Sequence, residues 1–430
     1  MDKKIKVLIF PAGEINSVEL HDALASNVNI EVYGASSVDR HGPYIFRNYM
    51  SGLPYICDPT FLDALNELIV KWEIDYIFPT HDSVALFMAE NRIKLKADVI
   101  ASDAETAQIC RDKRAIYGLF KKEVFCPHIY SGFTHFPCFI KPRKGQGAVG
   151  AMLVESVENI PANVTLADYV VTEYLPGEEL TVDCFTDGIG NLRAILPRTR
   201  KRLLAGISVA GETIPTCQEI QKIAETINRK LKFFGLWYFQ LKQDGNRQYK
   251  LLEVSTRCAG AMCLSRARGI NLPLLSIYAA SGQEVEVFEN SYSVQMDRTL
   301  ISRYQIDYEY QTVYVDYDDT IVFREEVCPA VIRFLYQCRN QNKKIVLLTK
   351  HSLSHKDTVL ESLKLYAISP DIFDEIVELS DAEEKSDFIR NADGAVFIDN
   401  AYFERKKVHE KIGIPVFDVE GVEVLLDWRS

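Results

Sequence analysis

Long hydrophobic runs and paired cysteine motifs are both missing from this chain of 430 residues. The first apolar run, Val7–Phe10, is interrupted by Pro11 and is far too short for a signal peptide or a membrane span. The 10 cysteines show no CxxC or CxxxC spacing, which argues against a disulfide framework or a zinc site. We therefore expect reduced thiols, a cytoplasmic location and no membrane partner.

Positive charge is also scarce, because 49 Lys and Arg residues face 60 Asp and Glu residues and the net charge is −11. Such a charge repels nucleic-acid backbones and anionic membranes, and a short basic cluster such as Arg198–Arg202 does not reverse it. Low-complexity tracts are absent, and the composition of 47% hydrophobic and 25% charged residues is that of an ordinary folded protein. We expect no nucleic-acid partner.

The order of apolar segments predicts a multidomain protein of mixed α/β and α+β class. In residues 1–100, strands and helices alternate, which indicates a parallel sheet with ligands at the carboxyl ends of its strands. Residues 101–290 contain helices and β-rich pairs typical of an α+β domain, and residues 291–311 have the weak periodicity of a linker. Alternation returns in residues 312–430, which predicts a second, C-terminal α/β domain.

The α+β segment combines cations and glycines in "KPRKGQGAVGA", Lys141–Ala151, at the turn of an expected hairpin. Glycines let backbone N–H groups close on an anion, and a lysine adds a point charge for phosphate oxygens; a solvated basic turn is the alternative. Downstream strands carry oxygen ligands of the kind that Mg²⁺ prefers. These residues are Glu173, Glu179, Asp183, Gln240 and Glu253.

Taken in order, these motifs resemble the ATP-grasp superfamily over residues 1–290, and within it the carbamoyl-phosphate synthase large chain. The likeness includes the preceding α/β domain with "DYIFPTHD" and the segment "DKRAIYGLF" at Asp112–Phe120. The resemblance implies ATP and Mg²⁺ as cofactors. It also implies phosphorylation of a carboxylate to an acyl phosphate, from which an amine or another nucleophile displaces the phosphate. Small-molecule carboxylates and amines are the implied partners.

The resemblance also implies contacts with the nucleotide. It assigns phosphate contacts to Lys113 and Lys141, the border of the adenine to Glu173 and Leu175, and the ribose hydroxyls to Glu179. The basic stretch "PRTRKRLLAGIS" matches a strand that faces the active site in related domains. Arg198 and Arg200 are therefore candidates to bind the substrate carboxylate or the γ-phosphate, with a solvated charged face as the alternative.

The metal signature departs from the family pattern. The resemblance implies that Gln240 and Glu253 hold magnesium and that Arg257 faces the transferring phosphoryl group or the substrate. The usual pattern is Glu-x-Asn with an Arg two places after the Asn, whereas "EVSTR" has Ser255 at the position of the Asn. A serine hydroxyl is shorter and a poorer ligand, so the second metal position stays open, with a bridging water as one solution.

The C-terminal segment begins with "VYVDYDDTIVF", Val313–Phe323, an apolar run that ends in aspartates. Side chains alternate along an extended chain, so Asp316 and Asp318 point the same way. The stretch resembles the first motif of the haloacid dehalogenase superfamily. The resemblance implies Asp316 as a nucleophile, Asp318 as a general acid and base, and Mg²⁺ to neutralise the carboxylates. The second Asp is typical of phosphatases rather than dehalogenases.

The other motifs of that superfamily follow in order. The resemblance implies that Thr349 binds phosphoryl oxygens, that Lys385 neutralises charge and that Asp399 joins Asp316 and Asp318 as a magnesium ligand. Asn400 and Glu404 are candidates to support them. About 33 residues separate Asp316 from Thr349 and about 36 separate Thr349 from Lys385, which leaves no room for a cap domain. An open site accepts a large phosphorylated substrate or is covered by another domain or subunit.

The sequence thus predicts a bifunctional enzyme, an ATP-grasp ligase joined to a Mg²⁺-dependent phosphatase that acts on a phosphorylated small molecule. The two steps would be sequential if the phosphatase acts on the ligase product. Two alternatives stay open: a phosphatase regulated by a degenerate nucleotide-binding module, which Ser255 favours, and a carbamate or carboxylate kinase. The sequence leaves the substrates open and allows an oligomer.

Overall fold

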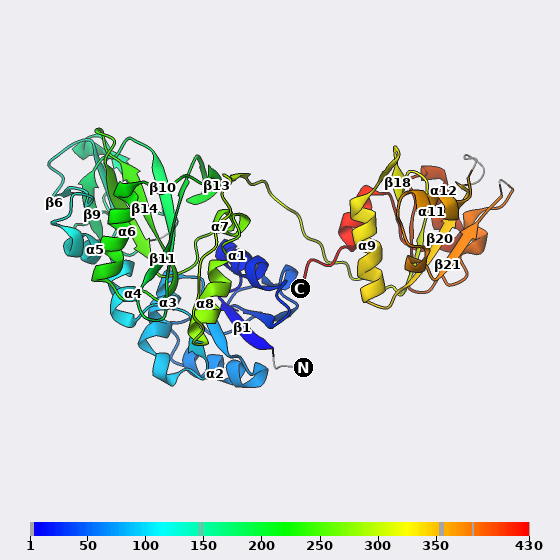
Figure 1. Cartoon of the computed structure of the whole chain (residues 1–430), viewed down its shortest axis with the longest axis horizontal. Coiled ribbons are helices and arrows are strands. Elements are labelled where there is room, and N and C mark those ends of the chain that lie inside the picture. Colours follow the sequence, from blue (N-terminus) through cyan, green and yellow to red (C-terminus); the bar gives the residue numbers. More distant parts are fainter. Residues whose placement is uncertain (1–3, 146, 148, 352–356, 381, 430) are drawn as a thin grey trace. The chain divides into compact units, whose positions relative to one another are not determined.

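The computed structural model describes residues 4–145, 147, 149–351, 357–380 and 382–429. The chain forms two compact units, of which the first extends to Leu300 and includes Arg429, and the second comprises Ile301–Trp428 (Figure 1). Each unit is described by itself. Within the described residues, no helix has both the length and the apolar character that a membrane span requires.

The first unit begins with a five-stranded parallel sheet in the order β3-β2-β1-β4-β5. Alternate residues of β1 enter different cores: Val7 and Ile9 pack with α1, and Leu8 and Phe10 pack with α2 and α3. The predicted parallel sheet is confirmed. Its elements are β1 (Ile5–Phe10), α1 (Ile15–Leu24), β2 (Ile30–Ala35), η1 (Gly42–Tyr44), β3 (Asn48–Met50), α2 (Phe61–Trp72), β4 (Tyr76–Pro79), α3 (Asp82–Glu90), η2 (Arg92–Lys94) and β5 (Asp98–Val99).

Two antiparallel four-stranded sheets follow, in the orders β6-β9-β7-β8 and β11-β10-β14-β15. Helices α4 and α5 precede the first sheet, and the strand pairs match the predicted α+β class. The elements of this part are α4 (Ala104–Arg111), α5 (Lys113–Phe120), β6 (Ile129–Tyr130), β7 (Cys138–Pro142), β8 (Met152–Val154), η3 (Val157–Asn159), β9 (Tyr169–Glu173), β10 (Glu179–Thr186), β11 (Leu192–Thr199), α6 (Gln218–Lys230), β14 (Gly235–Gln243) and β15 (Tyr249–Ser255).

Helix α6 shows why the second of these sheets has a firm core. Its apolar residues recur at helical spacing, so one face is buried against the sheet. The largest fully buried side chain there is Trp237, which stacks on Phe233 with ring centroids 3.8 Å apart and donates from Nε1 to Thr186 at 2.9 Å. A buried indole N–H needs such an acceptor. This sheet therefore gives the site residues on β10, β14 and β15 a rigid base.

Part of the predicted linker, residues 291–311, is a strand in the structure. Gln295–Asp297 form β16, which pairs with β13 because Ala210 lies opposite Asp297 and Glu212 opposite Gln295. The weak periodicity of so short a strand hides it in the sequence. The remaining elements of the first unit are β12 (Arg202–Leu204), β13 (Ile207–Glu212), α7 (Cys263–Ala267), α8 (Leu272–Ala280) and β16 (Gln295–Asp297).

The second unit contains a five-stranded parallel sheet in the order β21-β20-β17-β22-β23 (Figure 1). Only hairpin β18–β19 and helix α9 lie between β17 and β20, all of which the structure describes, so no cap domain is inserted there. The elements are β17 (Thr312–Val315), β18 (Val322–Phe323), β19 (Glu326–Val327), α9 (Pro329–Asn340), β20 (Lys344–Thr349), α11 (Val359–Leu365), η4 (Pro370–Ile372), β21 (Glu375–Glu378), η5 (Lys385–Phe388), β22 (Ala395–Ile398), α12 (Tyr402–Ile412), β23 (Val416–Phe417) and η6 (Glu420–Leu425).

Candidate functional site

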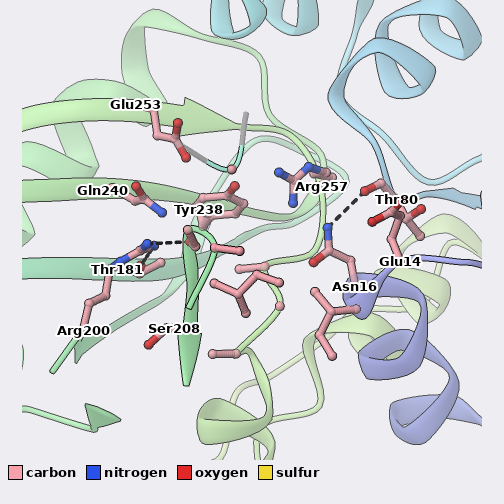
Figure 2. Close-up of a pocket in the computed structure, with 18 of the residues that line it drawn as sticks. Glu14, Asn16, Thr80, Thr181, Arg200, Ser208, Tyr238, Gln240, Glu253 and Arg257 are labelled. Atoms are coloured by element: carbon pink, nitrogen blue, oxygen red, sulfur yellow. Dashed lines mark hydrogen bonds between the residues drawn. The ribbon is translucent and has the colours of Figure 1, made fainter. Parts of the chain in front are cut away.

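Two neighbouring cavities of the first unit contain most of the predicted ligase residues. The first cavity, of about 220 Å³, is lined by Arg257 and Tyr238 together with residues of the N-terminal sheet such as Glu14 and Thr80 (Figure 2). The second cavity, of about 260 Å³, is lined by residues of β7, α5 and the glycine-rich turn. The two cavities share a wall formed by Gly147, Arg200, Gly206, Gln240 and Glu253.

The second cavity brings together two cations and a carboxylate that the sequence predicts to act together. Lys113 Nζ lies 3.9 Å from the Glu253 carboxylate and donates to the Gly145 carbonyl at 3.3 Å. Lys141 is buried on β7, where its Nζ donates to the Leu252 carbonyl at 3.5 Å. Burial, together with the charge of Lys113, lowers the pKa of Lys141 to about 7. Two cations side by side in a cavity suit a polyanionic ligand.

Strand register explains how Gln240 and Glu253 meet. They lie directly opposite each other on the antiparallel strands β14 and β15, so their side chains share one face of the sheet. Both side chains line both cavities (Figure 2). An amide oxygen and a carboxylate oxygen beside two lysines are ligand atoms that fit Mg²⁺ bound to phosphates.

Ser255 and Arg257 follow Glu253 but contact a residue that the sequence analysis does not select. Ser255 Oγ donates to Asp82 Oδ1 at 2.6 Å, and Arg257 Nη2 lies 3.1 Å from Asp82 Oδ2. Asp82 opens helix α3, directly after the carboxyl end of β4. The motif "DYIFPTHD" at the end of an expected strand was the available signal, since ligand sites gather at such ends.

Arg198 and Arg200 lie on the same face of β11 and its extension but pair with different carboxylates. Arg198 is buried, and its Nε and Nη2 donate to the Asp183 carboxylate at 2.8 and 3.1 Å. Arg198 also lines the first cavity, so its predicted contact with the substrate carboxylate or the γ-phosphate stays a prediction. Arg200 pairs with Glu179 at 2.9 Å and lines both cavities, as the prediction for a ligand contact requires.

The two predicted adenine contacts lie outside the lining of both cavities described above. Glu173, at the end of β9, accepts a hydrogen bond from the backbone N–H of His128 at 2.7 Å. Leu175 is buried two residues later. Glu179, the predicted ribose contact, does line the second cavity, although its carboxylate is bound by Arg200 and lies 3.8 Å from Lys242. The adenine contacts of Glu173 and Leu175 stay a prediction.

The Asp183–Arg198 pair makes a prediction about stability. Asp183→Ala should lower the free energy of unfolding of the first unit by about 3–5 kcal/mol, because it leaves the buried Arg198 guanidinium without its counter-charge. Urea unfolding followed by tryptophan fluorescence measures this loss. Asp297→Ala is the control, since it removes an aspartate from an exposed pair with Arg202 and should change the midpoint little. Equal midpoints for the two variants would contradict the prediction.

The second unit brings the predicted phosphatase residues to one edge of its parallel sheet. Asp316 follows β17, Thr349 ends β20 and Asp399 follows β22, and these three strands are neighbours. Lys385, on the η5 turn, places its Nζ 2.7 Å from Asp316 and 2.6 Å from Asp399. Burial and the charge of Asp399 raise the pKa of Asp316 to about 7, although Lys385 opposes this rise.

Asp318 faces a different partner from Asp316. Its carboxylate lies 2.7 Å from His351 Nδ1 and accepts a hydrogen bond from Thr349 at 3.5 Å. His351 lies two residues after Thr349 and outside the motifs of the sequence. Asn400 accepts a hydrogen bond from Thr320 Oγ1 at 3.3 Å, and Glu404 lies 3.6 Å from Lys350.

The three aspartates predicted to bind magnesium do not form a preformed cluster. In the described part of the chain, no group of three or more His, Cys, Asp or Glu side chains is arranged to hold a metal ion. The reason is geometric: Lys385 lies between Asp316 and Asp399, whereas Asp318 is turned to His351. The carboxylate oxygens suit Mg²⁺ in kind, but the metal set stays a prediction.

The first unit combines a parallel sheet, two antiparallel sheets and the Gln240–Glu253 strand pair beside Lys113, an arrangement similar to that of ATP-grasp proteins. Residues 165–300 match a family model described as "ATP-grasp in the biosynthetic pathway with Ter operon". The family model and the similar solved structures together support placing the first unit in the ATP-grasp superfamily. The chain has no match among curated proteins.

Solved structures similar to this chain show the same fold at low sequence identity. Biotin carboxylase from Campylobacter jejuni, in complex with β,γ-ATP, has a TM-score of 0.53 and 16% identity over 66% of this chain and 72% of its own. N5-carboxyaminoimidazole synthetase from Staphylococcus aureus, complexed with ADP, has a TM-score of 0.55 and 15% identity over 66% and 79%. L-amino acid ligase from Bacillus licheniformis has a TM-score of 0.51 and 15% identity over 65% and 75%.

Proposed function

We propose that the first unit is an ATP-dependent ligase that joins a small carboxylate to an amine or a similar nucleophile through an acyl phosphate. The observation that carries this proposal is the shared wall of the two cavities, where Gln240 and Glu253 separate a lysine-lined cavity from one that contains Arg257. One cavity can hold nucleotide phosphates while the other holds the acceptor, with the reacting groups meeting at the wall.

The residues of the first unit have distinct tasks in this proposal. Lys113 and Lys141 bind and orient the phosphates, and Arg200 and Arg257 neutralise the charge that develops on the transferring group. Mg²⁺, held by Gln240 and Glu253, would supply further charge neutralisation at the phosphate oxygens. The nucleotide complexes of the biotin carboxylase and the carboxyaminoimidazole synthetase support ATP as the ligand of this site.

For the second unit we propose a phosphatase that acts through an aspartyl phosphate. Asp316 attacks the phosphorus of a phosphomonoester, and the leaving oxygen takes a proton from Asp318, which returns the substrate alcohol. Asp318 then takes a proton from the water that cleaves the aspartyl phosphate and releases inorganic phosphate. The observation that carries this proposal is the contact of Lys385 with both Asp316 and Asp399 at the strand ends. Mg²⁺ bound to carboxylates of this edge would neutralise the phosphoryl group.

Magnesium-dependent ATP turnover in Asp316→Asn protein tests the ligase, because this variant removes the phosphatase background. Pools of carboxylates and amines are screened, with ADP and inorganic phosphate counted separately. We expect equal amounts of ADP and phosphate only when an acid and an amine are both present. ADP with free acyl phosphate and no need for an amine would instead establish a carboxylate kinase.

A second candidate function is a nucleotide-sensing module that regulates the phosphatase. The contact of Ser255 with Asp82 favours it, since Ser255 occupies the position of a metal ligand in the family pattern. ATP that binds, changes phosphatase activity and never becomes ADP would support this alternative over the ligase.

Nucleotide binding should be linked to proton uptake at Lys141. With a pKa of about 7, most Lys141 side chains are neutral at pH 8, and phosphate oxygens restore the charged form. The groups that act on Lys141 are Lys113, Lys242, Glu179 and Glu253. Binding at pH 8 should therefore take up close to one proton, and uptake should fall towards pH 6, where the free lysine is already charged.

Titration calorimetry with a non-hydrolysable ATP analogue in two buffers of different ionisation enthalpy measures this uptake. Lys141→Met should remove the buffer dependence and weaken binding. Lys222→Met is the control, because Lys222 is exposed on α6 and lines neither cavity. Wild-type enthalpies that agree in both buffers at pH 8 would rule out the linkage.

A further inference from the structure

The carboxylate of Asp82, the first residue of helix α3, binds two residues that follow Glu253 in the chain. Asp82 Oδ1 accepts a hydrogen bond from the Ser255 hydroxyl at 2.6 Å, and Asp82 Oδ2 pairs with Arg257 Nη2 at 3.1 Å. Burial alone would raise the pKa of Asp82, but Arg257 and the hydrogen bond from Ser255 hold it below its usual value. Asp82 is therefore a charged acceptor for both side chains.

The Arg257 guanidinium is fixed in all but one direction. Nη2 pairs with Asp82, Nη1 donates to the Cys258 carbonyl at 3.0 Å, and the guanidinium carbon lies 5.5 Å from the centre of the Tyr238 ring. Its Nε is buried and has no hydrogen-bond partner in the described part of the chain. Because Arg257 lines the first cavity, its guanidinium lies beside any anionic group bound there (Figure 2).

Asp82 is itself tied to the glycine-rich turn. The residue after it, Ser83, accepts a hydrogen bond from Arg111 Nε at 3.1 Å, and Arg111 Nη1 donates to the Gly145 carbonyl at 3.4 Å. Arg111 thereby joins the start of α3 to the turn beside the second cavity. A displacement of Asp82 would therefore disturb the hydrogen bonds that connect its neighbour Ser83 to Arg111 and Arg111 to Gly145.

We infer that Asp82 is a positioning residue that aims Arg257 at the anionic group of the acceptor, and that Ser255 serves this network rather than a metal ion. The inference rests on the proposed ATP-dependent function. It assigns the anion to a carboxylate or phosphoryl group that is bound in the first cavity beside the Arg257 guanidinium.

The surroundings of Ser255 disfavour a divalent cation beside it. Ser255 and Asp82 line a small cavity of about 30 Å³, whose other charged residues are Arg111, Lys113, Arg257 and Glu253. Three cations face two carboxylates there, and like charge opposes a further cation. The Ser255 hydroxyl already donates its hydrogen bond to Asp82. Divalent cations should therefore be bound with the nucleotide through Gln240 and Glu253.

The metal part is tested by electron paramagnetic resonance of Mn²⁺ bound to the full chain with a non-hydrolysable ATP analogue. Ser255→Ala should leave the Mn²⁺ dissociation constant within about twofold of wild type, whereas Glu253→Gln should weaken it at least about tenfold. Loss of a Mn²⁺ ion in Ser255→Ala would overturn the inference while leaving nucleotide binding, and so the proposed function, in place. Wild-type protein that binds no Mn²⁺-nucleotide would overturn both.

The positioning part is tested by a double-mutant cycle. Asp82→Asn should slow ADP formation on the order of 10²-fold with the nucleotide dissociation constant unchanged, because it misplaces Arg257 rather than the phosphates. If Asp82 acts through Arg257, Asp82→Asn should cost nothing further in an Arg257→Ala background. Asp187→Asn, which alters another Asp–Arg pair outside the cavities, is the stability control. Independent, additive losses from Asp82 and Arg257 would overturn the assignment.

Discussion

Asp316→Asn is expected to lower phosphatase activity on the order of 10⁴-fold or more, because an amide cannot replace the carboxylate that attacks phosphorus. The substitution changes no volume, and Lys385 keeps its contact with Asp399 at 2.6 Å, so the strand ends should stay in place. The measurement is Mg²⁺-dependent release of p-nitrophenol from p-nitrophenyl phosphate. This substrate needs no specific leaving-group contacts, so the result does not depend on the identity of the natural phosphomonoester.

The matched control for this prediction is Asp393→Asn, which changes an exposed aspartate just before β22 in the same unit. It should keep wild-type phosphatase activity. ADP formation by the first unit should be the same in both variants, since Asp316 belongs to the second unit. An Asp316→Asn protein that keeps more than about a tenth of the activity would show that this aspartate is not the nucleophile.

In the second unit, strand order explains why the candidate residues could be expected at one edge of the sheet. Asp316, Thr349 and Asp399 each follow or end a buried apolar strand, and the carboxyl ends of neighbouring parallel strands meet at one edge. The contact of Asp318 with His351 was not predictable in the same way. A histidine two residues beyond a strand end can turn to either side, and only the packed chain fixes its direction.

In the first unit, the sequence shows charges but not their partners. Gln240 and Glu253 could be paired because both lie on expected adjacent strands, and the register of β14 and β15 places them opposite each other. Arg198 and Arg200 are equally basic in the sequence. Arg198 pairs with the buried Asp183 on β10, whereas Arg200 pairs with Glu179 and lines both cavities, and these partners depend on cross-strand register and burial.

Asp82 is the clearest example of a residue that local sequence cannot assign. It lies 173 residues before Ser255, at the start of helix α3, and its motif is only a strand end followed by a helix start. Hydrogen bonding across that distance in the chain depends on how the N-terminal sheet and β15 pack in the first unit. The interpretation of Ser255 as a weak metal ligand was the natural one from the sequence, because its partner was not visible there.

Glu253→Gln should have the largest effect on the first unit, slowing ADP formation on the order of 10³-fold. Glu253 lines both main cavities and lies 3.9 Å from Lys113, so its carboxylate belongs to the wall that the two cavities share. The amide keeps the shape but loses the charge that a divalent cation needs. Nucleotide affinity should fall less than the rate does, because the lysines still bind phosphate.

The charge of Glu253 also acts on Lys141, and this gives the variant a second signature. Glu253 raises the pKa of Lys141, so its removal should lower that pKa below about 7 and leave more of the lysine neutral. Nucleotide affinity of Glu253→Gln should therefore weaken at a lower pH than in the wild type. Glu225→Gln, an exposed substitution on α6, should change neither the rate nor the pH profile. If Glu253→Gln forms ADP within about tenfold of the wild-type rate, Glu253 is not an essential magnesium ligand, because the loss of such a ligand slows the reaction more than this.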